Sequence, residues 1–478
     1  VQALIGRMCL DAAGYQTRRG DIKRVNGKGE SMTFENKGKE NNGATYGRRS
    51  DWQNLYTIAK KYYEALLADP GNAQFHLTDP RGASDKSGRT FNNPYQYFFE
   101  QMHMDDAIYA DESIYEYPMQ QGGGNDGRPY SFGRPSSGGS KAAYPCKSYG
   151  QGRINPAYFY GIFDPNDMRR DVSITMTGSN GKGVEKLIPF VPNSKAEGGG
   201  LTLNKWDENR QANPWVAAQR KSGINGPYMR MSEVYLGYAE VCAALGDVVT
   251  GKQYLKTVRE RSFPQGLADT DGFIASFGND LVRAIIEERG FEYAGEGDRR
   301  WTLIRSGYLP EDIKRIKDMT KAMMDGLATK GYYEFENGNI ISAYIWTKLV
   351  DAKTIYGHRL TAQCPMDKVN DPVLYPGWRG QKDNWEEMGL NYGNSAPATN
   401  LAIKGLFEIV SEEEAASLES QGYAKVNWGI DLVDYRDEYD KYLFWDYDYV
   451  SAPIYLWPFT PNVMAAGGFT NGYGFKQE

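Results

Sequence analysis

Apolar residues along this chain fall at helical spacing in a few stretches, which are separated by long polar ones. They recur every three or four residues over Val1–Tyr15, and again from Asp51 until Pro70 and Gly71 interrupt the pattern. This period is typical of an α-helix that buries one face. The same period predicts five further helices, over Phe91–Gln101, Met229–Leu245, Thr250–Arg261, Asp280–Gly295 and Pro310–Thr329.

The helices predicted at Met229–Leu245 and Thr250–Arg261 are separated only by a short Gly-containing link. Two antiparallel helices joined by a tight turn form one repeat unit. Such units bury their apolar faces by stacking on neighbours, and they leave extended surfaces for binding. We therefore predict a mostly α fold, a tetratricopeptide-like superhelix of helix pairs near residues 1–70 and 229–329.

The remaining parts, residues 112–228 and 331–478, show little helical spacing. Alternation over Glu112–Tyr117 predicts a short strand, and an acidic patch at Ser411–Gln421 predicts one more helix. The polar, Gly-rich stretch Arg18–Arg49 is predicted to be a loop. We expect these parts to form a large irregular lobe with a few short strands. The lobe and the helical repeats together are predicted to form one domain, residues 1–478.

Composition narrows the class of function. The chain contains 35 Tyr, 10 Trp and 54 Gly but only 3 His. Tyr and Trp have an apolar ring and a polar group, so they suit partly solvent-exposed binding surfaces as well as cores. A net charge of −6 argues against nucleic acid, because that binding needs clustered Lys and Arg against phosphates. The sequence contains no run of 18 apolar residues, which is about the length that a membrane-spanning helix needs.

Metal and redox chemistry have little support in the sequence. The four cysteines form no CxxC pair, and Cys9 and Cys242 stand among helical apolar residues as small buried hydrophobes. Their disulfide state stays open. We expect no cofactor. The acidic run Asp431–Asp448 is interpreted as a solvated face and a packing strand, and calcium binding by this run is the alternative. The sequence at Thr177–Gly183 lacks the residues of a phosphate loop and is predicted to be a turn between strands.

Several motifs then occur in an order that is similar to one known family. They are YMRMSEVYLGYAEVCAALG (228–246), TVRERS (257–262), IEERGFEYAGEGDRRWTLIR (286–305), YLWPFT (455–460), NGY (471–473) and, upstream of these, the segment 156–171 with Asp167, Arg169 and Arg170. In this order they resemble the SusD/RagB family of nutrient-uptake outer-membrane lipoproteins. The carboxylates and guanidiniums of residues 286–305 are interpreted as structural, because bidentate ion pairs would lock one helix pair to the next.

The resemblance implies a non-catalytic ligand-binding protein. Family members sit on the outer face of the outer membrane of gram-negative, glycan-using bacteria, and they deliver oligosaccharides to a SusC-like TonB-dependent transporter. They reach the membrane through an N-terminal lipid anchor, and that anchor is not in this sequence. The family also carries a long helical part ahead of the helix that matches Val1–Tyr15, so we expect the sequence to be a fragment.

The resemblance places ligand contacts only by region, in the Gly-rich stretch Gln121–Pro156 and in an aromatic stretch near residues 375–392. Aromatic residues flanked by Gly and Pro in loops are less often core than aromatic residues on helices. The predicted ligand-binding residues are Asn125, Arg128, Tyr130, Tyr144, Tyr149, Tyr375, Trp378, Arg379, Asp383, Trp385 and Tyr392.

Three alternatives to glycan capture remain open at this point. The same fold could capture peptides. A glycoside hydrolase would need two carboxylates roughly 5–9.5 Å apart, and only Asp126 and Asp383 stand alone in an aromatic, Gly-rich setting. A scaffold that binds only other proteins would leave the long aromatic loops without a role.

Overall fold

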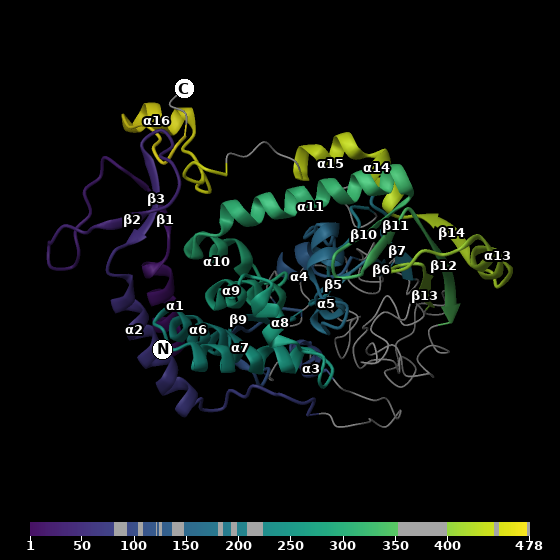
Figure 1. The fold of residues 1–478 in the computed structure, drawn as a ribbon, viewed down its shortest axis with the longest axis horizontal. Helices are drawn as coiled ribbons and strands as arrows, with labels where there is room; N and C mark the ends of the chain where they lie inside the picture. Colours follow the sequence, from purple (N-terminus) through teal and green to yellow (C-terminus); the bar gives the residue numbers. More distant parts are fainter. Residues whose placement is uncertain are drawn as a thin grey trace.

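The structure is a computed structural model of the 478-residue chain. It describes residues 1–80, 93–103, 109–120, 122–123, 127–135, 148–179, 185–192, 198–207, 223–351, 399–443 and 449–475. The fold is mostly α, as predicted from the sequence. Helical pairs form one side of the molecule and a strand-rich part forms the other, with the long helix α11 running between them (Figure 1).

Helices make up more of the described backbone than strands do. They are α1 (Gln2–Ala13), α2 (Trp52–Ala68), α3 (Pro94–Gln101), α4 (Gly127–Phe132), α5 (Arg169–Ser173), α6 (Met231–Ala244), α7 (Val248–Ser262), α8 (Thr270–Ala275), α9 (Leu281–Glu292), α10 (Asp298–Ser306), α11 (Leu309–Lys330), α13 (Glu412–Ser420), α14 (Gly429–Asp434), α15 (Arg436–Leu443) and α16 (Pro461–Gly467), with a π-helical turn at Tyr158–Ile162.

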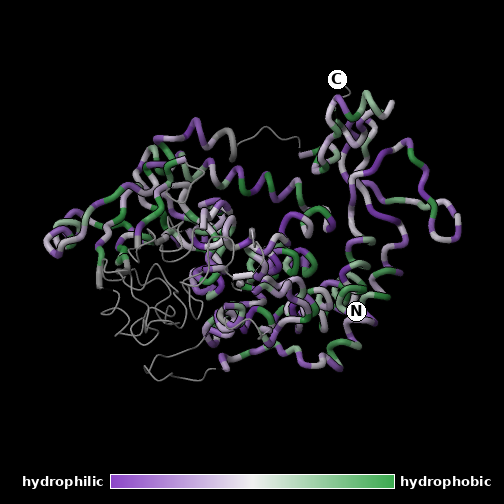
Figure 2. Tube along the Cα trace, turned by 180° about the vertical axis from the view of Figure 1, so that it is seen from behind, coloured by the Kyte–Doolittle hydropathy of each residue, from purple (hydrophilic) through white to green (hydrophobic). Residues whose placement is uncertain are grey.

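Local signals set the ends of the main helices. The Asp247 and Asp280 side chains accept hydrogen bonds from the first-turn amides of α7 and α9, which caps both helices. Pro310 stands in the first turn of α11, and Gly331 ends that helix with a φ of 77°. Along α11 hydrophilic and hydrophobic residues alternate as expected for a helix with one buried face (Figure 2).

Helices α1, α2 and α6 pack closely around one tyrosine. The Tyr63 ring of α2 lies against Gly6 of α1 and Gly237 of α6, where a Cβ atom at either glycine would overlap the ring. Tyr63 is buried, and Cys9 and Cys242 are buried free thiols in the same core. Their predicted role as small hydrophobes is confirmed.

The strands are short and form small antiparallel sheets. They are β1 (Gln16–Arg19), β2 (Phe34–Asn36), β3 (Ala44–Arg49), β4 (Ser113–Tyr117), β5 (Ile174–Thr175), β6 (Thr177–Ser179), β7 (Glu185–Leu187), β8 (Thr202–Leu203), β9 (Gly226–Arg230), β10 (Tyr332–Glu334), β11 (Ile340–Ser342), β12 (Tyr344–Asp351), β13 (Thr399–Lys404) and β14 (Ala424–Asn427). β4 pairs with β9, and β6 pairs with β7. The predicted strand at Glu112–Tyr117 is confirmed. Of the predicted turn at Thr177–Gly183, the first three residues form β6 and the others lie outside the described residues.

Two predictions for these parts are wrong. The stretch Arg18–Arg49 is not a single loop, because β1, β3 and β2 form a sheet there. The described part of the acidic run after Asp431 lies in α14 and α15 instead of a strand. The sheet of order β13–β12–β14 after Gly331 agrees with the few short strands that were expected there. Strands this short and polar show little alternation, and their pairing depends on distant partners.

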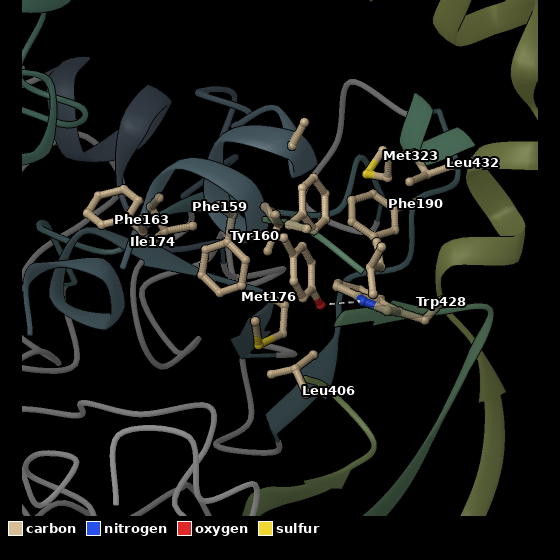
Figure 3. Packing of buried hydrophobic residues seen from close by; sticks show 14 of the residues in the cluster. Phe159, Tyr160, Phe163, Ile174, Met176, Phe190, Met323, Leu406, Trp428 and Leu432 are labelled. Carbon is tan, nitrogen blue, oxygen red and sulfur yellow. Dashed lines mark hydrogen bonds between the residues drawn. The ribbon is translucent and has the colours of Figure 1, made fainter. Parts of the chain in front are cut away.

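An aromatic core joins the strand-rich part to the helices. Trp428 is fully buried, and its indole Nε1–H donates to the Tyr160 hydroxyl at 2.9 Å (Figure 3). Phe190 lies against the Trp428 ring, with ring centroids 4.2 Å apart. Met323 of α11 packs into the same cluster, so this core holds α11 against the strand-rich part.

The charged residues near α9 are buried and form ion pairs. Glu288 accepts hydrogen bonds from Arg169 and Arg259, each at 2.7 Å. Glu292 accepts from Arg169 at 3.1 Å and also from Arg230. These bonds tie α5, α7, α9 and β9 together, which confirms the interpretation that the charges of the 286–305 motif are structural.

Candidate ligand-binding cleft

Three tyrosines stand on one face of the β4–β9 ribbon. Tyr115 and Tyr117 are two residues apart in β4 and so point to the same side, and Tyr228 of β9 lies beside them. The three ring centroids are 5.5 to 6.0 Å apart and meet edge to face. Glu116 turns to the opposite face, where it accepts a hydrogen bond from Asn225 at 2.9 Å. The tyrosine rings stay exposed as a result.

Two arginines hold the edges of this tyrosine cluster. The Arg7 guanidinium lies 4.8 Å from the Tyr228 ring centroid, and it is fixed by two bonds to the Glu233 carboxylate and one to the Tyr228 carbonyl. The Arg128 guanidinium lies 5.5 Å from the Tyr117 ring centroid. It occupies the space that a Cβ atom of residue 226 would fill, so Gly226 makes room for it.

These side chains line a cleft of about 490 Å³, which we name the tyrosine–tryptophan cleft after Tyr117, Tyr228 and Trp301. Residues of α1, α9 and α10 complete its walls. Trp301 of α10 is 58% exposed, because the buried face of that helix is made by the residues that follow it. An exposed indole on a rigid helix provides a flat apolar platform with a polar edge.

The floor of the cleft is built from ion pairs. Arg230 donates to both carboxylate oxygens of Glu296, at 2.9 and 3.1 Å. Arg289 donates to Asp298 at 2.5 Å, while Nη1 of Arg289 is buried and lacks a hydrogen-bond partner in the described part of the chain. The buried Tyr293 ring lies within 5 Å of both guanidiniums. A polar ligand group would find donors and acceptors that are already in place.

Burial and pairing fix the charge states of this floor. Burial alone would raise the pKa of Asp298, but the positive charge and hydrogen bond of Arg289 keep that pKa below its usual range. Burial lowers the pKa of the neighbouring Lys205 ammonium to about 8, although the Glu296 carboxylate opposes this shift. These ion pairs fix the distance between the elements that form the walls of the cleft.

The structure places three of the eleven residues that were predicted to bind ligand. Arg128 lies in the wall of the cleft. Tyr130 is buried and packs edge to face on Tyr149, with ring centroids 5.0 Å apart, and the Tyr149 amide donates to the Tyr130 carbonyl. The residues that lie outside the described part are Asn125, Tyr144, Tyr375, Trp378, Arg379, Asp383, Trp385 and Tyr392.

Sequence reasoning missed the aromatic residues of the cleft. Tyr115 and Tyr117 were assigned to a strand, and Trp301 was included only as part of a structural motif. Trp301 directly precedes four buried residues of α10, and only the structure shows that its own side chain stays exposed. The tyrosine cluster itself depends on the pairing of β4 with β9, more than 100 residues apart in sequence, which no local pattern reveals.

A sequence profile of the SusD family matches residues 73–458, which is well over half of the chain. The chain belongs to the SusD family. No curated protein matches its sequence. The helix that carries Trp301 and the strand that carries Tyr228 both lie inside the matched range, whereas the part of the lining that α1 contributes, including Arg7, lies ahead of it. No helix among the described residues has the length and apolar character that crossing a membrane requires.

Solved structures of related proteins are distant from this SusD-family chain. A SusD homologue from Bacteroides thetaiotaomicron is 16% identical, with 66% of this chain and 55% of that one covered and a TM-score of 0.42. NanU of B. fragilis is 16% identical, with 64% and 56% covered and a TM-score of 0.37. Surface glycan-binding protein A from B. thetaiotaomicron, in complex with laminarihexaose, is 18% identical, with 55% and 52% covered and a TM-score of 0.35. The chain spans about half the length of these structures.

Proposed function

We propose that this chain binds oligosaccharide at the bacterial cell surface and delivers it to a SusC-like TonB-dependent transporter in the outer membrane. Membership of the SusD family supports this function, and one of the related proteins is described as a glycan-binding protein with a bound hexasaccharide. The observation that carries the proposal is the exposed Trp301 platform, which lines a cleft with two exposed tyrosines and fixed arginines.

The cleft has the parts that sugar binding needs. A pyranose ring presents C–H groups on its faces and hydroxyls around its rim. The flat faces of Trp301, Tyr117 and Tyr228 can cover the C–H groups, while Arg7 and Arg128 can donate hydrogen bonds to hydroxyls. Because these groups are held by the ribbon and by Glu233, little side-chain freedom is lost on binding.

The carboxylates of the cleft do not favour hydrolysis. Glu233, Glu296 and Asp298 are each bonded to an arginine, so none is free to face a substrate as a general acid or base. Asp11 is the remaining carboxylate of the lining: burial raises its pKa, with Arg305 at 3.8 Å opposing the shift, but no second carboxylate free of an arginine stands with it among the described lining residues, as glycoside hydrolysis would need. We therefore propose a binding protein that acts without catalysis and without a cofactor.

Peptide capture is the second candidate, because the same aromatic and charged groups can also hold a peptide. The two ligand classes are separated by titrating the chain calorimetrically with neutral oligosaccharides and with a mixed peptide library. Oligosaccharide binding without peptide binding supports the proposal. Peptide binding alone would replace it with the second candidate.

The site is tested in the same titration with Trp301→Ala. Loss of the indole platform is expected to weaken oligosaccharide binding about tenfold or more, which corresponds to about 1.4 kcal/mol. The matched control is Trp457→Ala, because Trp457 is 91% exposed and lies outside the cleft. Equal affinities for the two variants and the unchanged chain would show that the ligand binds elsewhere.

A further inference from the structure

Helix α9 presents two opposite faces, and each face lines a different cleft. Arg289 and Tyr293 are four residues apart and line the tyrosine–tryptophan cleft. Glu287 and Phe291 are also four residues apart, and they line a second cleft of about 630 Å³. Since residues two apart on a helix point in nearly opposite directions, the two clefts lie on either side of α9. α8 and α10 both pack on α9 near this point (Figure 1).

The second cleft has aromatic walls on two sides. Phe273 of α8 and Phe277, just after that helix, meet edge to face, with ring centroids 5.3 Å apart. Tyr333 and Phe335, from β10 and the residue after it, meet in the same way at 4.8 Å. We name this the phenylalanine cleft, after Phe273, Phe277 and Tyr333. Phe273, Phe277 and Tyr333 all remain partly exposed, so each wall offers aromatic surface to an occupant.

Charged groups stand between these walls. The Arg259 guanidinium is stacked 3.8 Å from the Phe273 ring centroid, and Arg315 donates to Glu287 at 2.6 Å. The Nε–H groups of Arg259 and Arg315 are both buried without an acceptor in the described part of the chain. A buried donor that lacks a partner costs free energy, and two such donors in one cleft indicate that an acceptor-rich group belongs there.

Acceptors lie at the open side of the cleft. Glu336 is exposed, and Asp164 is partly exposed and holds the Asn166 amide at 2.8 Å. The deeper carboxylates, Asp167 and Glu287, are already bonded to arginines. The cleft therefore combines aromatic faces with fixed donors and carboxylate oxygens, and its four carboxylates outnumber its two guanidiniums, which disfavours an anionic ligand.

We propose that the phenylalanine cleft is a second sugar-binding site, which takes a neutral pyranose unit. A sugar matches both parts of the lining, because its ring faces are apolar and its hydroxyls donate and accept. This inference rests on the proposed glycan function for its ligand class. It adds a site remote from Trp301, and two sites on one rigid helix let a long polysaccharide bind with an avidity that exceeds the affinity of either site.

The test is calorimetric titration with maltotriose, cellotriose, laminaritriose and mannotriose, which are too short to bridge two sites. Ser276→Trp fills the phenylalanine cleft from an exposed position on its lining, and Glu336→Ala removes one acceptor. Glu334→Ala is the matched control, because Glu334 is exposed two residues away, at the end of β10, and lies outside the lining. We expect two binding events in the unchanged chain and in the control. Trp301→Ala should remove one of them, and Ser276→Trp should remove the other.

The possible outcomes separate the two proposals. If a trisaccharide binds once and only Trp301→Ala weakens it, the second site is refuted while glycan capture stands. If no trisaccharide binds and peptides do, glycan capture fails and the second sugar site fails with it. A fall of about tenfold or more in the second event with Glu336→Ala, with the first event unchanged, supports the second site independently of the filling variant.

Discussion

Single contacts at glycines decide how closely the parts of this molecule approach one another. Tyr63 fits between α1 and α6 because neither Gly6 nor Gly237 carries a Cβ atom. Gly226 makes room for the Arg128 guanidinium in the same way. Neither Gly237 nor Gly226 has a positive φ, so the space, and not the backbone conformation, requires glycine there.

The contact at Tyr63 leads to a prediction about stability. Gly237→Ala is expected to lower the free energy of unfolding by about 1–3 kcal/mol, because the added methyl group overpacks a buried site. Urea denaturation followed by circular dichroism measures this change. Tyr63→Phe is the control and should be close to neutral, since the Tyr63 hydroxyl is buried without a partner among the described residues. An unchanged midpoint for Gly237→Ala would contradict this packing.

The contact at Gly226 leads to a prediction about binding. Gly226→Ala should displace the Arg128 side chain from the wall of the tyrosine–tryptophan cleft and weaken oligosaccharide binding about as much as Arg128→Ala does. The double variant should bind no more weakly than either single variant, because both changes remove the same group. Additive losses in calorimetric titrations would show that Gly226 acts through something other than Arg128.

At the scale of elements, α9 is the part on which the rest is assembled. Its buried carboxylates bind arginines from α5, α7 and β9, and its two faces line two clefts. A helix with so many buried charges would be unstable alone, because each charge needs a partner from another element. The position of α9 is therefore fixed only when its neighbours are in place.

The ion pairs of Glu287, another buried carboxylate of α9, predict that the protein loses stability in acid. Burial alone would raise the pKa of Glu287, but the charges of Arg299, Arg315 and Arg283 lower it to about 2. Because the folded-state pKa lies below the ordinary value near 4.5, the stabilisation is complete above about pH 4.5 and is lost as pH falls towards 2. Thermal unfolding measured between pH 6 and pH 2.5 should show this decline.

Glu287→Gln provides the matched variant for that measurement. It should be less stable at neutral pH by about 1.5–3 kcal/mol, since three partly buried arginines then keep only Asp312 as their shared counter-charge. Its melting temperature should also fall less steeply between pH 4.5 and pH 2.5 than that of the unchanged chain. If the melting temperatures of the two proteins fall in parallel with pH, the ion pairs of Glu287 do not lower its pKa in the folded protein.

At the scale of the whole molecule, the sequence predicted the helical part well and the strand-rich part poorly. Helix α11 was predicted to run from Pro310 to Thr329 and runs from Leu309 to Lys330, because Pro310 and Gly331 mark its ends locally. The sheet of β12, β13 and β14 joins residues as far apart in sequence as Tyr344 and Asn427, and its pairing leaves no local signal. For the cleft, family resemblance pointed to the region of Arg128, while Trp301 and Tyr228 became visible only in three dimensions.

The central claim, that the tyrosine–tryptophan cleft binds oligosaccharide, is tested most directly by a crystal structure of the chain grown with an oligosaccharide that it binds in solution. The account predicts a sugar ring stacked on Trp301, with a hydroxyl within hydrogen-bond distance of Arg7 or Arg128. A sugar bound at the exposed aromatic residues around Trp457, with the cleft left empty, would contradict it.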